Sequence, residues 1–176
     1  MTKAICGCDG LPAKTGRRDF IKLAALGGGA MLLAPRIAMA AGHAEALLLN
    51  CIDYRLNDKV TTYMNGRGLK ENYDQVILAG AALGAVNTKF PDWGRTFNQH
   101  LDVAIQLHDI QRVIILDHRD CGAYRVILGK DLTGDAEKAL HATELHTLAK
   151  RIHAKHPKLA IETLLMSLDG RVETIA

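Results

Sequence analysis

Residues 112–122 read RVIILDHRDCG, and this stretch decides the fold class. Its four consecutive apolar residues, 113–116, are bounded by polar side chains. A short, continuous apolar run with β-branched residues is typical of a strand that is buried on both faces of a parallel sheet. Polar residues 117–121 follow directly, where the strand would give way to a loop. The stretch therefore predicts an interior strand with chemically active side chains at its carboxyl end.

Similar apolar runs occupy residues 46–51, 74–79 and 159–168, and Asp169-Gly170 predicts a hairpin into a short strand at 171–175. Apolar spacing and turn residues predict a short helix ending near Gly68, a helix over 97–108 capped by Asp92, and a long helix from Gly134 to Pro157. Strands that alternate with helices predict an α/β fold. We expect a mostly parallel central sheet of four strands, an antiparallel C-terminal edge strand, and helices on both faces.

The first forty residues predict a cleaved signal peptide instead of a part of the fold. Arg17-Arg18 precede a short apolar run rich in Gly and Ala, and Ala38-Met39-Ala40 is a small-x-small cleavage pattern. The paired arginines are typical of the twin-arginine route, so we expect a periplasmic protein. The apolar run is short for a span of ~30 Å, which disfavours a membrane anchor that persists after cleavage. Residues 41–176 would form the single mature domain.

Removing this segment changes what charge and cysteine content imply. Of the 22 Lys/Arg and 19 Asp/Glu residues, six and two lie within 1–40, so the remainder has a net charge of −1. A near-neutral domain gives no indication of nucleic-acid or anionic-membrane binding. Two cysteines remain, Cys51 and Cys121. In an oxidising compartment a disulfide between them is the first alternative, and a metal site is the second.

Polar residues follow two of the predicted strands in a pattern that favours the metal site. The first strand runs into Cys51-Ile-Asp53-Tyr-Arg55, and the strand at 113–116 runs into His118-x-x-Cys121-Gly122. If the two strands are neighbours in a parallel sheet, Cys51, His118 and Cys121 converge at one edge. Two thiolates and an imidazole suit zinc, and three protein ligands leave a fourth tetrahedral position for water, as in catalytic sites. Zinc can lower the pKa of that water to about 7, which provides hydroxide near neutral pH.

These two motifs resemble those of the β-class carbonic anhydrases, and the resemblance covers roughly residues 46–175. It implies that Cys51, His118 and Cys121 bind one zinc ion per chain and that Asp53 and Arg55 form the catalytic pair beside it. The implied reaction is the reversible hydration of carbon dioxide to bicarbonate by a zinc-bound hydroxide. Relatives of the family hydrolyse carbonyl sulfide or carbon disulfide with the same metal chemistry, and a non-catalytic zinc- or disulfide-stabilised domain is a further alternative. Family members are usually dimers or higher oligomers, so the resemblance also implies a homo-oligomer.

The chain departs from the family pattern at several positions. Asp117 stands where the family usually has Gly, and Tyr54 stands where it often has Ser. Asp117, Arg119 and Asp120 surround the ligand positions and are candidates for supporting them. The small residues at 79–85 predict close backbone packing near the site. The histidines of the long helix, His141 among them, are expected on its solvated face.

Overall fold

The structure is a computed structural model that describes residues 42–176. The predicted signal peptide at residues 1–40 lies outside the described residues, so its prediction stays untested. None of the helices in the described part of the chain is long and apolar enough to cross a membrane.

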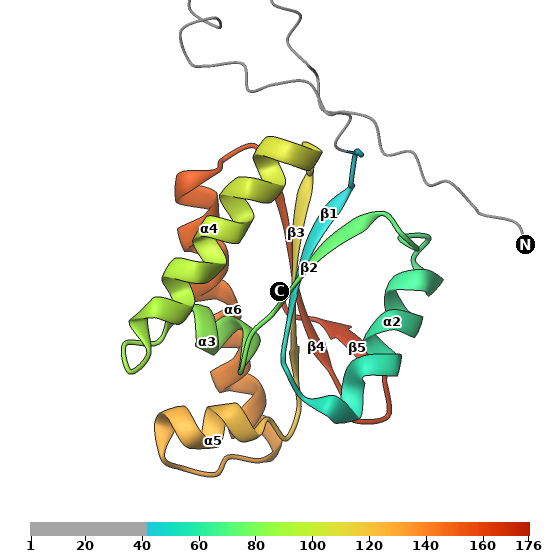
Figure 1. The fold of residues 1–176 in the computed structure, drawn as a ribbon. Helices are drawn as coiled ribbons and strands as arrows, with labels where there is room; N and C mark the ends of the chain where they lie inside the picture. Colours follow the sequence, from blue (N-terminus) through green and yellow to red (C-terminus); the bar gives the residue numbers. More distant parts are fainter. Residues whose placement is uncertain (1–41) are drawn as a thin grey trace, which may run out of the picture. The chain divides into compact units, whose positions relative to one another are not determined.

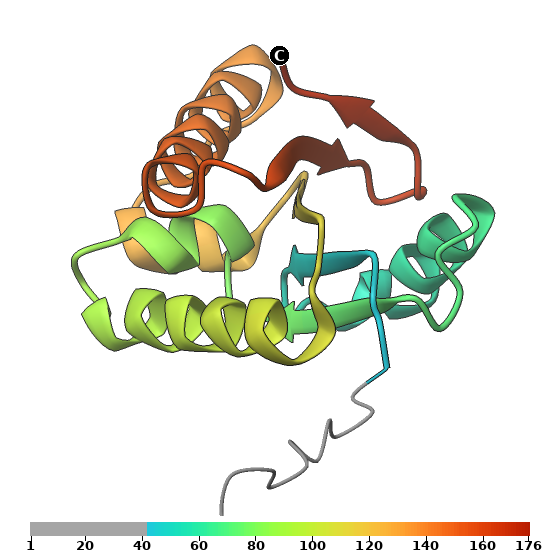
Figure 2. The ribbon, with the colours of Figure 1, turned by 90° about the horizontal axis from the view of Figure 1, so that it is seen from above.

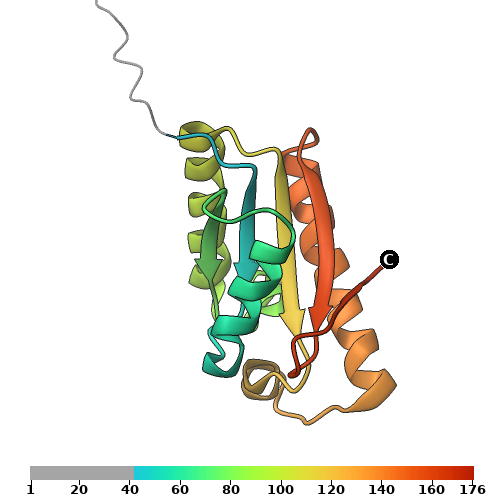
Figure 3. The ribbon, with the colours of Figure 1, turned by 90° about the vertical axis from the view of Figure 1, so that its right-hand side faces the viewer.

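The described residues form a five-stranded sheet in the order β2-β1-β3-β4-β5. The strands are β1 (Ala46–Asn50), β2 (Tyr73–Ile77), β3 (Arg112–His118), β4 (Ala160–Met166) and β5 (Val172–Thr174). The pairs β1–β2, β1–β3 and β3–β4 are parallel, and β5 runs antiparallel to β4 at the edge. Figure 3 shows these strands side by side. The predicted α/β fold, with four parallel strands and an antiparallel C-terminal edge strand, is confirmed.

Helices cover both faces of the sheet, as Figures 1 and 2 show. Helix α2 (Asn57–Gly66), which follows the short 3-10 helix η1 (Tyr54–Leu56), packs on one face. The other face is covered by α3 (Ala81–Val86), α4 (Pro91–His108) and α6 (Gly134–Lys155). Helix α5 (Gly122–Leu128) lies beyond the carboxyl end of β3.

Alternate side chains of the central strands supply two separate cores. Leu47 and Leu49 of β1 pack with α3, α4 and α6, whereas Leu48 packs with α2. All five residues of β1 are buried, because helices cover both of its faces and strands flank both of its edges. This double burial explains why the strand is continuously apolar from Ala46 to Leu49 rather than alternating.

One helix boundary differs from the sequence prediction, and two short helices were not predicted. Helix α4 begins at Pro91, because proline suits the first turn, where its missing N–H is not needed. Asp92 lies within that turn, so the prediction that it caps the helix is wrong. The small residues of 80–91 include α3, and the residues after Cys121 form α5, neither of which was predicted. Both are short helices whose stability comes from packing rather than from a long amphipathic pattern.

Candidate metal centre

Three potential metal ligands converge where the order of the strands reverses. Cys51 follows the last residue of β1, His118 is the last residue of β3, and Cys121 is the residue before α5. Strands β1 and β3 are paired in parallel, so their carboxyl ends meet at the same edge, which is the usual ligand position in such sheets. One ligand atom from each residue lies within 4.8 Å of the others. The predicted convergence of Cys51, His118 and Cys121 is therefore present.

The spacing of these atoms fits a metal better than a disulfide. The two sulfur atoms lie 3.8 Å apart, and both thiols are free. Zinc–thiolate bonds of about 2.3 Å at a tetrahedral angle would place two sulfurs about 3.8 Å apart. The Nε2 atom of His118 is buried and has no hydrogen-bond partner among residues 42–176, while its Nδ1 lies 2.8 Å from the carbonyl oxygen of Arg119. A carbonyl contact at Nδ1 fixes the ring so that Nε2 offers its lone pair to a metal.

The surroundings of the two thiols shift their pKa values in opposite directions. The Cys121 and Cys51 sulfurs lie within hydrogen-bonding distance, and this contact lowers the pKa of Cys51 against the opposing effect of burial. His118 and the backbone N–H of Gly80, which lies 3.3 Å from the sulfur, favour the Cys51 thiolate further. The same thiol contact, together with burial, raises the pKa of Cys121. A bound cation would displace the thiol proton that lies between the two sulfurs, and both cysteines would then be thiolates.

The charge of the thiolate also acts on the histidine. Burial favours the neutral ring of His118, but the nearby Cys51 sulfur outweighs burial and raises the pKa of His118. His118 is only 2 % exposed. Its ring is therefore held in place by the protein interior and by its carbonyl contact, not by solvent.

Asp53 forms a bidentate ion pair with Arg55 and lies close to His118. The Arg55 Nε donates to one carboxylate oxygen of Asp53 at 2.9 Å, and Nη2 donates to the other at 2.7 Å. Asp53 also accepts the backbone N–H of Arg55 at 3.0 Å, which caps η1. These hydrogen bonds lower the pKa of Asp53 to about 2. The Asp53 carboxylate lies 3.8 Å from His118 Nε2 but is turned to the guanidinium, so it is outside the ligand cluster.

An apolar pocket adjoins the ligands and the ion pair. It has a volume of about 280 Å³, and Cys51 and Asp53 form part of its wall. The rest of the wall is mainly apolar and comes from the loop after β2, from α4 and from α5, with the side chains of Ala79, Trp93, Ala123, Val126 and Ile127. Trp93 is held by stacking on Phe90, at 4.4 Å between ring centroids. The pocket could therefore receive a small, weakly polar molecule next to the metal ligands.

A family model described as "Putative carbonic anhydrase" matches residues 41–176. The chain belongs to this carbonic anhydrase family. Two uncharacterized proteins are similar to it: one from Rickettsia conorii, 40 % identical, and one from Rickettsia bellii, 39 % identical. Each alignment spans 134 residues and covers 75 % of this chain. It covers 72 % of the length of the Rickettsia conorii protein and 82 % of the length of the Rickettsia bellii protein. The relatives thus share most of the domain.

Solved structures of β-carbonic anhydrases share the fold. The tetrameric enzymes of Sordaria macrospora match with a TM-score of 0.51 at 14 % identity, over 89 % of this chain and 85 % of theirs. The enzyme CafD of Aspergillus fumigatus matches with the same TM-score and identity, over 76 % and 90 %. The two sequence motifs predicted membership of the β-carbonic anhydrase family. The family and the fold are therefore confirmed.

A buried carboxylate, that of Asp117, lies directly before His118 in β3. Asp117 is 1 % exposed and accepts the N–H of Ala82 at 2.9 Å and the hydroxyl of Tyr124 at 2.5 Å. The carboxylate oxygen that accepts from Tyr124, Oδ2, also lies 2.8 Å from Nδ1 of His141. Burial and the charge of Asp117 raise the pKa of Tyr124 well above its usual value. Asp117 thus joins α3, α5 and α6 to the end of β3.

His141 corrects an expectation from the sequence. It was predicted on the solvated face of the long helix, but it is 1 % exposed and pairs with Asp117. The signal available in the sequence was the charge of Asp117 inside an otherwise apolar strand, because a buried carboxylate needs partners. Which residues supply them depends on the packing of α5 and α6, which the sequence pattern did not reveal.

Proposed function

We propose that the protein is a zinc-dependent carbonic anhydrase that hydrates carbon dioxide reversibly to bicarbonate. The observation that carries the proposal is the unpartnered Nε2 of His118, which lies with two free thiols beside an apolar pocket. Two sulfurs and one imidazole nitrogen are a ligand set typical of zinc, and three protein ligands leave room for catalysis. Family membership and fold agree with this chemistry.

Each residue of the site would have a defined task. Cys51, His118 and Cys121 would hold the metal, and a zinc ion held there would supply Lewis-acid chemistry that makes hydroxide available near neutral pH. Asp53, kept ionised by Arg55, would accept a hydrogen bond and so orient the attacking group. The apolar wall of the pocket would keep carbon dioxide close and exclude excess water.

Metal analysis combined with a stopped-flow hydration assay tests the proposal. We expect about one zinc per chain in a Cys6→Ser, Cys8→Ser background, where Cys51 and Cys121 are the remaining thiols. His118→Ala should lose both metal and activity, whereas His153→Ala, which changes an exposed histidine of α6, should keep both. Full activity after metal removal would contradict the proposal.

The pocket wall gives little polar discrimination, so carbonyl sulfide and carbon disulfide belong in the same substrate panel. They are small, apolar and electrophilic at carbon, as carbon dioxide is. Hydrolysis of either one without hydration of carbon dioxide would assign the protein to the alternative hydrolase function. Zinc content without turnover of any of the three would favour the non-catalytic alternative.

We further propose that the protein works as a homo-oligomer in the periplasm. Support for assembly comes from the tetrameric state of the Sordaria macrospora enzymes and from apolar side chains exposed beside the pocket. Ile52, Tyr54 and Val126 are 59 %, 83 % and 63 % exposed. Light scattering of the purified protein should give a mass above that of the monomer, and a monomer at micromolar concentration would contradict assembly. The periplasmic location rests on the twin-arginine pattern of residues 15–40.

A further inference from the structure

Asp120 occupies a special position between two candidate metal ligands. It lies after His118 and directly before Cys121, in the loop that joins β3 to α5. Its φ angle of 53° is in the left-handed region, which Asp and Asn tolerate better than most residues do. Its backbone N–H donates to Glu137 of α6 at 2.5 Å. The loop thus presents the Asp120 side chain in one direction, toward the end of β1.

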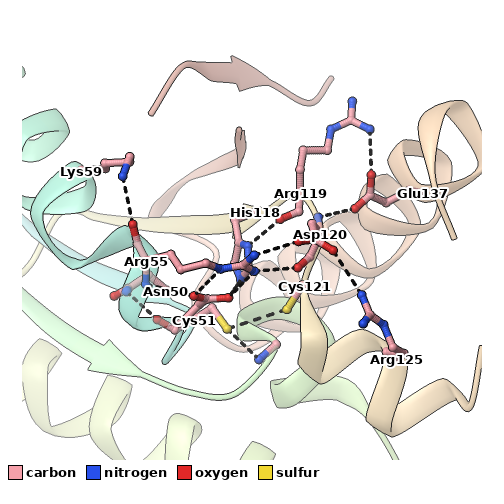
Figure 4. A network of polar contacts seen from close by, with 12 residues as sticks. Asn50, Cys51, Arg55, Lys59, His118, Arg119, Asp120, Cys121, Arg125 and Glu137 are labelled. Atoms are coloured by element: carbon pink, nitrogen blue, oxygen red, sulfur yellow. Dashed lines mark hydrogen bonds and ion pairs between the residues drawn. The ribbon is translucent and has the colours of Figure 1, made fainter. Parts of the chain in front are cut away.

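The Asp120 side chain and carbonyl both contact Arg55. The Nη1 of Arg55 donates to the Asp120 carboxylate at 2.8 Å, and Nη2 donates to the Asp120 carbonyl at 2.9 Å. Figure 4 shows Arg55 reaching across to this loop. The other carboxylate oxygen of Asp120 accepts from Arg125 at 3.1 Å.

The guanidinium of Arg55 is therefore shared between two carboxylates. Nε and Nη2 face Asp53, while Nη1 and Nη2 face Asp120. A guanidinium has five N–H donors in a fixed plane, so contacts on two of its edges define its position and its orientation. With Asp53 alone, Arg55 could move together with that carboxylate, because its side chain is 34 % exposed.

We propose that Asp120 is a positioning residue that anchors Arg55, and that this anchor keeps the Asp53 carboxylate turned away from the metal. This inference rests on the proposed function, because it presumes a metal held by Cys51, His118 and Cys121. Asp53 Oδ2 lies 3.8 Å from His118 Nε2, so a modest rotation would bring a carboxylate oxygen to the metal and fill its fourth position. The anchored guanidinium holds that oxygen at 2.7 Å instead.

The proposal can be tested without measuring catalysis, by asking how easily an outside anion reaches the metal. The full chain, with Cys6→Ser and Cys8→Ser, is loaded with cobalt(II), whose visible absorption reports on its ligands. Thiocyanate is then titrated into the protein. Because a carboxylate bound to the metal competes with thiocyanate, we expect Asp120→Asn to weaken thiocyanate binding by about two- to fivefold, the range of a partly exposed charged pair. Asp120→Gly accepts the positive φ without strain and removes the side chain, so its effect should be at least as large.

A double variant distinguishes this role from a merely structural one. In an Asp53→Ala background the competing carboxylate is absent, so adding Asp120→Asn should leave thiocyanate affinity unchanged. Asp131→Asn is the matched control, because among the described residues Asp131 pairs with Arg125 and Arg55 pairs with Asp53 and Asp120, so affinity should stay at the starting value.

Equal affinities in the starting protein and in both Asp120 variants would overturn the proposal. It would also be overturned if Asp120→Asn weakened binding equally with and without Asp53. Failure of the proposed function would look different: cobalt and thiocyanate would bind, and the Asp120 effect would appear, but the zinc protein would not hydrate carbon dioxide.

Discussion

The Nδ1 atom of His141 lies 2.8 Å from Oδ2 of Asp117, and both side chains are almost wholly buried. Asp117 belongs to β3, and His141 belongs to α6. The contact therefore connects the residue before His118, a candidate metal ligand, to the longest helix of the described chain. The hydroxyl of Tyr124 shares the same carboxylate oxygen. Such a fully partnered polar group in the interior holds its elements in one arrangement.

This network predicts a large loss of stability when Asp117 is removed. Asp117→Ala leaves three buried groups without their acceptor, so we expect the free energy of unfolding to fall by about 3–5 kcal/mol. Urea denaturation monitored by circular dichroism measures the change. Asp102→Ala is the control, because its pairing with Lys155 is about half exposed and should cost no more than ~1 kcal/mol. Similar losses in the two variants would contradict this role for Asp117.

The ion pair of Asp53 and Arg55 predicts a loss of stability in acid. Arg55 lowers the pKa of Asp53 from 3.8 to about 2, so the folded state favours the ionised carboxylate more than the unfolded state does. The resulting stabilisation is complete above about pH 4 and is lost as the pH falls toward 2. We expect about 1 kcal/mol, since solvent screens a partly exposed pair. In Arg55→Gln, denaturation curves between pH 4 and 2 should show a weaker dependence; an unchanged slope would exclude the pair as its source.

Metal removal predicts two reactive thiols and a less stable protein. In the Cys6→Ser, Cys8→Ser background, chelation followed by unfolding should expose two titratable thiols per chain, from Cys51 and Cys121. Restoring zinc at a thousand times its dissociation constant should stabilise the fold by about 4 kcal/mol, measured as a rise in melting temperature. Absence of free thiols without reductant would instead show a disulfide.

The apolar pocket predicts that a bulky side chain at its mouth slows the reaction without releasing the metal. Val126 of α5 lines the pocket and is 63 % exposed, so Val126→Trp can be accommodated by the fold while narrowing access. We expect kcat/KM for carbon dioxide to fall at least about tenfold with zinc content unchanged. Leu107→Trp, at another exposed apolar position on α4, is the matched control. Equal activity in both variants would place the substrate elsewhere.

The N-terminal pattern predicts export that depends on both arginines. Replacing Arg17 and Arg18 by lysine keeps the charge but removes the twin-arginine signature, so we expect the protein to accumulate in the cytoplasm. Cell fractionation with immunoblotting measures its distribution. Lys14→Arg, which changes a nearby basic residue, should leave export intact. Normal export of the double-lysine variant would point to another route.

Much of this architecture could be predicted from the sequence, because strands buried on both faces leave a simple signal. The runs at 46–49 and 113–116 are continuous and apolar, and the polar residues that follow them identified Cys51 and Cys121 as ligand candidates. The prediction of close backbone packing at residues 79–85 is also confirmed. A Cβ on Gly84 would lie 2.2 Å from the carbonyl oxygen of Ala79. This close packing places Gly80 where its N–H reaches the Cys51 sulfur.

What could not be predicted depends on contacts between distant elements. The partners of Asp117 come from three helices, and the one on α6 is 24 residues away. The second anchor of Arg55 is 65 residues away and relies on a left-handed backbone at Asp120. Neither distance leaves a periodic pattern in the sequence. The short helices α3 and α5 likewise gain their stability from the packing of the completed domain.

The pairing of β1 with β3 has a consequence for when the protein can take up its metal. Between Cys51 and Cys121 the chain forms η1, α2, β2, α3, α4 and β3, and the two residues are 70 positions apart. Closing so long a loop is entropically costly and comes late in the assembly of a sheet. A chain emerging from the ribosome therefore has no centre to fill until its third strand has been made and has found the first. Metal capture would then mark the pairing of β1 with β3, whether or not the later strands β4 and β5 have joined the sheet.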